Sequence, residues 1–296
     1  MKFETKATIA LACSALLWST GGLFIKLVDW NSVSIAGSRS FIASFVLLVH
    51  LKKPKPDFSR PQIAAAFSSA CAMIFYVLAN KMTTAANTIL LQYTAPVYVA
   101  ILAWIILKEK PTFDNWIALF IIMSGMVLFF SEKLSTGNMY GNIIAVFSGL
   151  ALAFFTVFMR MQKGKSSYES FYLAHIITFL ISIPFIIRSS FPDTSGWLGI
   201  FALGIFQTGF ASLLFAYGIK YIPALKAVFI MTLEPILNPL WVFIFTGEAP
   251  GIYAIIGGII IISAVLFTTA YSSQRKRIIQ KKKGGAYETG RKSSTT

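Results

Sequence analysis

Long apolar runs recur along the whole chain and leave only short polar connections between them. An α-helix needs about 20 apolar residues to cross a hydrocarbon core roughly 30 Å thick, and a spanning segment must satisfy its backbone hydrogen bonds internally. The runs therefore predict an all-α, polytopic membrane protein. We expect ten transmembrane helices, at residues 6–28, 31–51, 61–80, 84–107, 112–131, 138–160, 167–188, 195–219, 222–245 and 250–271.

The charged residues set the expected topology. Only 12% of the chain is charged, against about 25% in soluble domains, so a soluble globule is excluded. The net charge of +15 does not point to nucleic acid, because 20 of the 26 Lys and Arg fall on one side if the N-terminus is cytoplasmic. The positive-inside rule then predicts a multi-pass protein of the cell (plasma) membrane with both termini cytoplasmic. Residues 272–296 are expected to form a basic, disordered cytoplasmic tail.

The second half of the chain repeats the first. APVYVAILAWIILKEKP at 95–111 aligns without a gap on EPILNPLWVFIFTGEAP at 234–250, with Pro96 on Pro235. Chance similarity between apolar helices does not readily match prolines and glutamates at fixed places.

We therefore expect two five-helix repeats, at residues 6–131 and 138–271. Because five is odd, the second copy would enter the membrane from the opposite side. Such an inverted repeat is typical of secondary transporters, because two half-structures of near-equal energy can exchange conformations and so open the protein to either side of the membrane.

Four stretches carry a family likeness: QYTAPVYVAILAWIILKEKPTFDNWIALFIIMSGMVLF, LEPILNPLWVFIFTGEAPGIYAIIGGIIIISAVLF, ALLWSTGGLFIKL and AGSRSFIASF. In them the chain resembles the drug/metabolite transporter superfamily, in its ten-helix EamA branch. The resemblance covers about residues 6–271. It implies an export-type carrier of small metabolites, with a central cavity lined mainly by helices 1, 3, 4, 6, 8 and 9. Members handle amino acids, amines, nucleobases and drugs, so the resemblance does not set the substrate.

The stretch LEPILNPL places a carboxylate, an amide and two prolines near the middle of a predicted span. A charged side chain at mid-bilayer costs at least about 2.5–3.5 kcal/mol, so it normally faces a partner or a wet cavity. Glu234, Asn238 and Trp241 share one helical face. Glu234 is therefore either a carboxylate that binds substrate or exchanges protons, or a structural partner of Arg39, Lys226 or the backbone.

The prolines predict interruptions of two helices. A proline inside a helix removes a backbone donor, and the carbonyls it frees are tolerated in a membrane only where they face protein or a cavity. Breaks at corresponding places of two repeats are a pointer to a substrate site. We expect hinges at Pro96, Pro235 and Pro239, with a fixed kink as the alternative.

Polar and aromatic residues on other helices complete the candidate site. Apolar walls with a few oriented polar groups are typical of small-molecule sites. Aromatic faces could cage an organic cation, or stack on an aromatic amino acid. Arg39 could hold a substrate carboxylate or a headgroup, or be a salt-bridged arginine. The expected substrate-binding residues are Glu234, Asn238, Trp241, Trp18, Tyr76, Gln92, Tyr93, Gln207 and Arg39.

One further glutamate precedes the last predicted helix of each repeat. Glu109 and Glu248 should cap the starts of these helices, where the positive end of the dipole favours a carboxylate. His175 aligns with Arg39 in the repeat and is expected to be a hydrogen-bonded packing residue.

Together these features predict a secondary transporter that exports a small metabolite, either an amino acid or an organic amine, with protons as a candidate coupling ion. The alternatives are an uptake carrier for a choline-like cation, and a lipid-moving or receptor-like protein that transports no solute. The sequence has no phosphate-binding glycine loop and only two Cys and two His. We therefore expect no enzyme activity, no cofactor and no metal. The expected partners are the bilayer and the substrate, and the protein would be a monomer or a homodimer.

Overall fold

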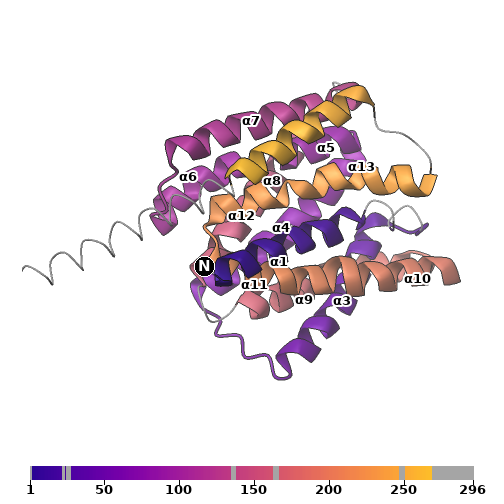
Figure 1. Ribbon diagram of the computed structural model, residues 1–296. Coiled ribbons are helices and arrows are strands. Elements are labelled where there is room, and N and C mark those ends of the chain that lie inside the picture. The colour runs from indigo at the N-terminus through magenta and orange to yellow at the C-terminus, as the bar shows by residue number, and fades with distance from the viewer. Residues whose placement is uncertain are drawn as a thin grey trace, which may run out of the picture.

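The structure is a computed structural model that describes residues 2–21, 24, 28–134, 138–162, 167–246 and 251–268. Within these residues all regular structure is helical (Figure 1). The first group of helices comprises α1 (Lys2–Ser19), α3 (Ser32–Leu51), α4 (Arg60–Met82), α5 (Ala85–Gln92), α6 (Ala95–Leu107) and α7 (Phe113–Phe130), followed by a short 3-10 turn, η1 (Ser131–Lys133).

The second group begins at residue 139. It comprises α8 (Met139–Met161), α9 (Ser167–Arg188), α10 (Thr194–Ala202), a π-helical segment η2 (Leu203–Phe210), α11 (Ala211–Tyr221), α12 (Ala224–Met231), α13 (Leu233–Thr246) and a last helix, Ile252–Thr268.

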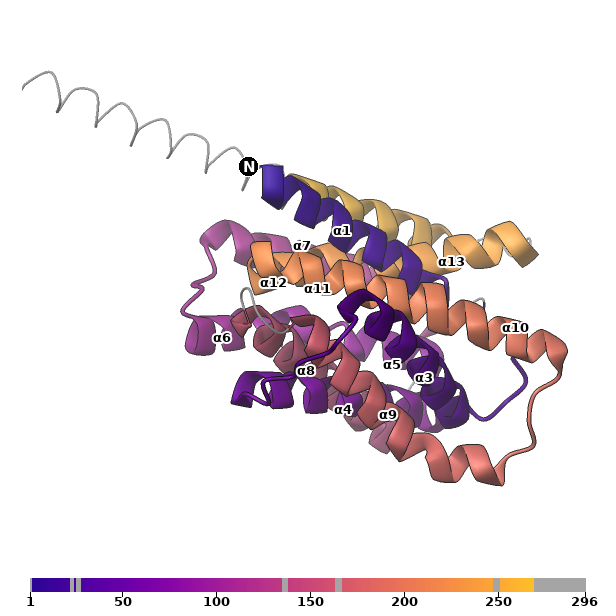
Figure 2. The same cartoon turned by 90° about the horizontal axis from the view of Figure 1, so that it is seen from below.

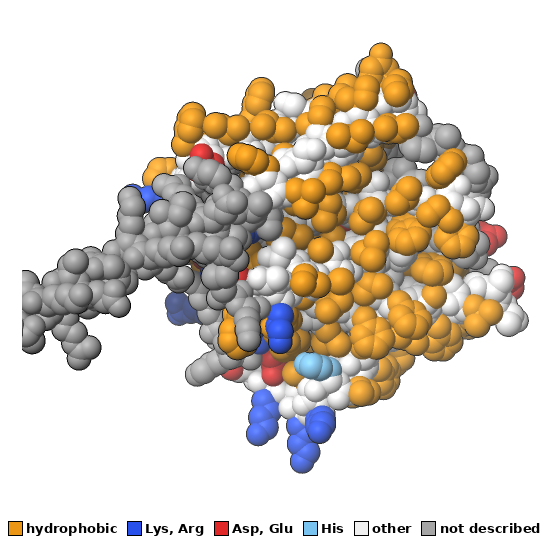
Figure 3. All heavy atoms as spheres, in the orientation of Figure 1, with side chains coloured by type: hydrophobic (Ala, Val, Ile, Leu, Met, Phe, Trp, Pro, Cys, Tyr) orange, Lys and Arg blue, Asp and Glu red, His pale blue; other side chains and the backbone are white. Residues whose placement is uncertain are grey.

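Among the described residues, seven helical stretches are long and apolar enough to cross a membrane, so the expected number of ten stays a prediction. Large apolar side chains also cover the outside of the bundle, as the orange surface of Figure 3 shows. Exposure of such an apolar surface to water would be unfavourable, whereas the lipid tails of a membrane are equally apolar and can surround it. The chain is therefore a polytopic helical membrane protein, as the sequence predicts.

Several helices begin where a polar side chain caps the first turn. Asn31, Thr84, Asn138 and Asp193 each accept a hydrogen bond from a backbone N–H of the helix that follows, at 2.8 to 3.1 Å. An N-terminal turn has unpaired donors, so a short oxygen-bearing side chain at this position stabilises the helix start. These caps explain why the helices start within a few residues of the predicted boundaries.

Three predicted spans are not continuous α-helices. Residues 84–107 divide into α5 and α6, and residues 222–245 divide into α12 and α13. Residues 195–219 stay helical but pass through the π-helical segment η2. The interruptions that the prolines predict in spans 84–107 and 222–245 are thus present. The π-helical segment was not expected, because apolar composition records membrane thickness and not the hydrogen-bond ladder of each turn.

The bundle is held together by helices from the two halves of the chain. α4 packs against α8, α3 against α9, and α1 against α11. Figure 2 shows α1 and α13 on one side of the bundle and α4 and α9 on the other. A close approach needs small residues: a Cβ on Gly149 of α8 would lie 2.6 Å from the carbonyl oxygen of Gln92.

An aromatic cluster forms the middle of this packing. Phe155, Phe171 and Phe215, from α8, α9 and α11, lie with ring centroids 5.2 to 5.8 Å apart. The indole of Trp18 in α1 packs on Phe215 at 5.4 Å. The buried cluster therefore fixes α1 and α11 beside each other, next to the two interrupted helices.

Candidate functional site

The two helix breaks meet through one hydrogen bond. Tyr93 ends α5, and Glu234 lies in the first turn of α13. The hydroxyl of Tyr93 donates to Glu234 Oε2 at 2.7 Å. Tyr93 is buried and Glu234 is half-buried. The partner of the intramembrane carboxylate is thus a phenol from the other half of the chain.

Threonines next to the breaks satisfy carbonyls that the interrupted ladders leave open. Thr94 Oγ1 donates to the carbonyl of Leu91 at 2.6 Å, and Thr232 Oγ1 donates to that of Phe229 at 2.6 Å. Ser and Thr side chains commonly take this role in membrane helices. At each break, therefore, a threonine of the chain itself satisfies one of the freed carbonyls.

The prolines stand just after the breaks, and not inside a continuous helix as expected. Pro96 and Pro235 both lie in the first turn of a new helix, α6 and α13. In a first turn the missing N–H costs nothing, because that donor would have no helical partner. Whether the protein bends here stays a prediction. The side chain of Pro239 lies outside the described part of the structure.

A guanidinium from another helix lies near the Glu234 carboxylate. Arg39, in α3, is close enough to Glu234 and Tyr76 for electrostatic interaction. Its Nη1 donates to Gln207 Oε1 over a long 3.4 Å, and its buried Nε has no partner among the described residues. A buried donor without a partner is costly, so Arg39 keeps hydrogen-bonding capacity for a further acceptor.

The π-helical segment η2 supplies the amide beside Arg39. Gln207 Oε1 also accepts from Thr208 Oγ1 at 2.8 Å, and Gln207 Nε2 donates to the carbonyl of Trp18 at 3.2 Å. Segments of π-helix are rare and occur frequently at functional sites, because they redirect side chains and release a backbone group. Here the segment aims Gln207 between α1 and α3.

Two tryptophans border the same region. Trp241 in α13 donates from Nε1 to Ser19 Oγ at 2.8 Å, at the end of α1. Trp18 is half-buried on Phe215. The indole of Trp241 thus joins α13 to α1, and the Trp18 carbonyl joins α1 to Gln207. Contact of either ring with substrate stays a prediction.

Other predicted site residues lie differently. Gln92 Nε2 donates to Ser148 Oγ at 2.7 Å, in the contact between α5 and α8, so it has a packing partner and its role in binding stays a prediction. The side chain of Asn238 lies outside the described residues. His175 is fully buried and shares a 3.1 Å hydrogen bond with Ser212, as expected of a packing residue.

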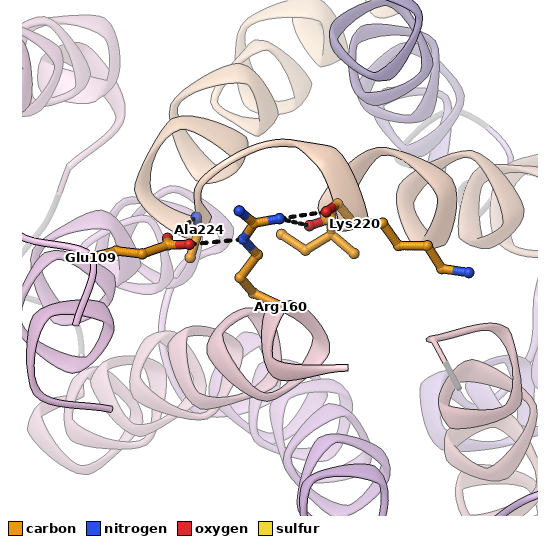
Figure 4. A network of polar contacts seen from close by, with 5 residues as sticks. Glu109, Arg160, Lys220 and Ala224 are labelled. Carbon is orange, nitrogen blue, oxygen red and sulfur yellow. Dashed lines mark hydrogen bonds and ion pairs between the residues drawn. The ribbon is translucent and has the colours of Figure 1, made fainter. Parts of the chain in front are cut away.

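Glu109 joins helices of both halves of the chain, as expected of a residue that anchors a helix junction. It binds Arg160 of α8 and the N-terminus of α12, which the sequence did not predict (Figure 4). Sequence reasoning missed Arg160, which counted only as one more basic residue at a helix end. Glu248, the counterpart of Glu109 in the repeat, lies outside the described residues.

Chemically, the central residues offer a carboxylate and a guanidinium that interact electrostatically, with aromatic rings and one amide around them. Such an arrangement can hold a small polar molecule by charge at two points. Among the described residues, no three His, Cys, Asp or Glu side chains gather as a metal site would require.

The helical membrane bundle and its paired helix breaks define a multi-pass membrane protein of the transporter type. Residues 5–131 and 139–270 each match the EamA-like transporter family. The chain belongs to this family, and so to the drug/metabolite transporter superfamily, whose members are transport proteins and not enzymes.

Known relatives support the class. A protein of Archaeoglobus fulgidus named as an uncharacterized transporter is 26% identical over 86% of this chain and 93% of its own length. The uncharacterized transporter YwfM of Bacillus subtilis is 26% identical over 85% and 91%. Solute carrier family 35 member G1 of Homo sapiens is 29% identical over 52% of this chain and 47% of its own length.

One crystal structure has the same fold. It aligns with a TM-score of 0.78 over 91% of this chain and 98% of that chain, at 18% sequence identity. At that identity the similarity concerns the fold alone.

Proposed function

We propose that the protein is a secondary transporter that exports a small amphiphilic metabolite, an amino acid or an organic amine, by alternating access. The observation that carries the proposal is the position of Glu234, bonded to Tyr93 across the two helix breaks and within electrostatic range of Arg39. Ten transmembrane helices in two inverted repeats, in a plasma membrane and with both termini cytoplasmic, complete the proposal.

Several observations support the repeat. The family matches the chain twice, over segments of similar length. The two broken helices, α5–α6 and α12–α13, fall at corresponding places of these segments. Repeats of near-equal energy allow a protein to exchange two arrangements around a fixed central site.

The proposed roles follow from the chemistry of the side chains. Glu234 would bind the ammonium group of a substrate or exchange it for a proton, and Arg39 would bind a carboxylate. Trp18, Trp241 and Tyr76 would contact the apolar part. The hydroxyl of Tyr93 would hold the Glu234 carboxylate in place when no substrate is bound.

The test is transport by purified protein in liposomes. Radiolabelled amino acids and amines should exchange across the membrane with wild type, and the Glu234→Gln variant should lose this activity although it folds. Flux that ignores an imposed pH gradient would exclude the proton-coupled form and leave facilitated diffusion. A protein that moves no solute from such a panel in either direction, but moves a labelled lipid, would be of the non-transporting class.

One observation favours a second candidate, uptake of a choline-like cation. Aromatic rings attract quaternary ammonium groups, and Trp18, Trp241 and Tyr93 lie on elements around Glu234. Choline flux into the liposome lumen, measured for both orientations of the protein, separates uptake from export.

A further inference from the structure

A second polar network, separate from the contacts of Glu234, lies at the end of the bundle where Phe3 packs on Tyr221. We call this the N-terminal end. There Arg160, in the last turn of α8, donates from Nε to Glu109 Oε1 at 2.9 Å (Figure 4). The Arg160 side chain is 9% exposed and that of Glu109 is 20% exposed. An ion pair this well covered is much less screened by water and salt than one on an open surface.

The same two side chains complete the ends of two consecutive helices. Arg160 Nη1 donates to the carbonyls of Ile219, at 3.1 Å, and of Lys220, in the last turn of α11. Glu109 Oε2 accepts from the backbone N–H of Ala224, at 3.0 Å, in the first turn of α12. A cation at a helix C-terminus and an anion at a helix N-terminus both oppose the local dipole charge favourably.

The network therefore connects both halves of the chain. Glu109 follows α6 of the first half, while Arg160, α11 and α12 belong to the second half. α12 ends at Met231, immediately before the break that carries Glu234. Movement of α12 relative to α6 must separate Glu109 from Ala224, so the network and the central site share a structural element.

From this geometry we propose that the Glu109–Arg160 pair is a latch that holds the N-terminal end of the transporter closed and must open once in each transport cycle. The proposal rests on the alternating-access function proposed above. Opening breaks the ion pair and the contacts to two helix ends at once, so the latch changes between discrete states and does not stretch gradually. Weakening it should shift the population toward the state that is open at this end.

Hydrogen–deuterium exchange on substrate-free protein in lipid nanodiscs tests the latch. Glu109→Gln keeps an oxygen for the Ala224 N–H but removes the charge that holds Arg160. We expect exchange in residues 219–226 to become about tenfold faster. Because the two ends of the protein alternate, exchange in residues 189–197 at the opposite end should become slower in the same variant.

The matched control is Glu132→Gln, which removes the charge of an exposed carboxylate by the same chemical change. It should leave both segments as in wild type. Faster exchange in residues 219–226 of Glu109→Gln without slower exchange in residues 189–197 would mean a local structural contact, and unchanged exchange in both would mean no latch. Either result overturns the proposal.

A conservative variant covers the case in which Glu109→Gln does not fold. Glu109→Asp keeps the charge but shortens the side chain by one methylene, and it should change exchange at both ends in the same directions by less. Because no substrate is needed, this experiment can succeed even if the substrate class proposed for Glu234 is wrong. The latch proposal is contradicted, whatever the substrate, if hydrogen exchange at the two ends changes independently.

Discussion

Tyr93 and Glu234 join the two helix breaks of the protein, with the phenol of the α5 end donating to the carboxylate of the α13 start at 2.7 Å. The two residues are far apart in the chain, and the repeat places them on opposite halves. Two interrupted ladders thus meet at one polar contact inside an apolar bundle. Under the proposed alternating-access function, this contact would belong to the central site.

This contact makes the charge and the hydrogen bond of Glu234 separable by mutation. Glu234→Gln keeps an acceptor for the Tyr93 hydroxyl but removes the charge, so transport of a cationic or zwitterionic substrate should fall at least about tenfold, since a charge-assisted bond contributes about 1.5–3 kcal/mol. Tyr93→Phe is the matched control, because it removes the bond and leaves the carboxylate. It should reduce transport less. Equal transport by wild type and Glu234→Gln in liposomes would contradict the assigned role.

The Nε of Arg39, which has no partner within the described part of the chain, predicts a preference for substrates that carry an acceptor. Arg39→Lys keeps the positive charge but lacks the planar fork that binds carboxylates at two points. For amino acids the KM should rise about 10- to 100-fold, the effect of losing one or two charge-assisted hydrogen bonds. For the matching amines without a carboxylate the KM should stay within a factor of about two.

Initial-rate measurements with both members of each substrate pair test this prediction. A parallel rise of KM for amines and amino acids would indicate a packing role for Arg39. Gln207→Glu, which would place a second carboxylate beside the guanidinium, should mimic the bound acceptor and lower amino-acid affinity without affecting the fold.

The close approach of α8 to the end of α5 makes Gly149 sensitive to substitution. A Cβ there would lie 2.6 Å from the backbone oxygen of Gln92 and 3.1 Å from that of Leu91, neither of which can rotate away. Gly149→Ala should therefore destabilise the protein by about 1–3 kcal/mol, as overpacking does. The measurement is the melting temperature in detergent.

Gly258→Ala is the control for this effect. Its added Cβ would meet side-chain atoms, a methyl of Ile236 at 3.3 Å and the ring of Phe129 at 3.6 Å, so the melting temperature should change little. If both alanine variants melt at the same temperature as wild type, the helix approach at Gly149 is looser than its geometry indicates.

The cap at the start of α10 predicts a dependence of stability on acid. Hydrogen bonds from the Gly196 N–H and the Ser195 hydroxyl lower the pKa of Asp193 below its usual value. A lowered folded pKa contributes stability that is present above the unfolded pKa and is lost as pH falls through the folded pKa. Asp193→Asn keeps a capping oxygen without the charge, so its melting temperature should approach that of wild type in acid. A constant difference between the two proteins down to about pH 3 would contradict this.

The hydrophobic pattern sufficed for the membrane helices, because each spanning helix must be apolar over its whole length whatever its neighbours are. It did not show the π-helical segment Leu203–Phe210, since its apolar run looks compatible with a continuous α-helix. The prolines correctly located the two helix breaks, but the expectation that they lie inside a continuous helix was wrong. Pro96 and Pro235 start helices, because a first turn has no hydrogen bond for them to remove.

Among the candidate site residues, the sequence singled out Glu234, Tyr93, Arg39 and Gln207 by type and by helix, but not their partners. Periodicity reports which face of a helix a residue occupies and says nothing about which helix lies opposite. The same limit explains why Glu109 was assigned to the helix that follows it in the chain. Its partners, Arg160 and Ala224, come close only after the two halves pack.

The sequence by itself thus determined that the protein is a polytopic helical membrane protein and which residue types are available for binding, because lipid solvent restricts composition segment by segment. Only the tertiary structure decided that Tyr93 meets Glu234, that Arg39 approaches from the facing wall and that Glu109 joins Arg160. These contacts depend on packing between helices distant in the chain. That packing is governed by the shapes and small residues of facing surfaces, which a linear pattern does not contain.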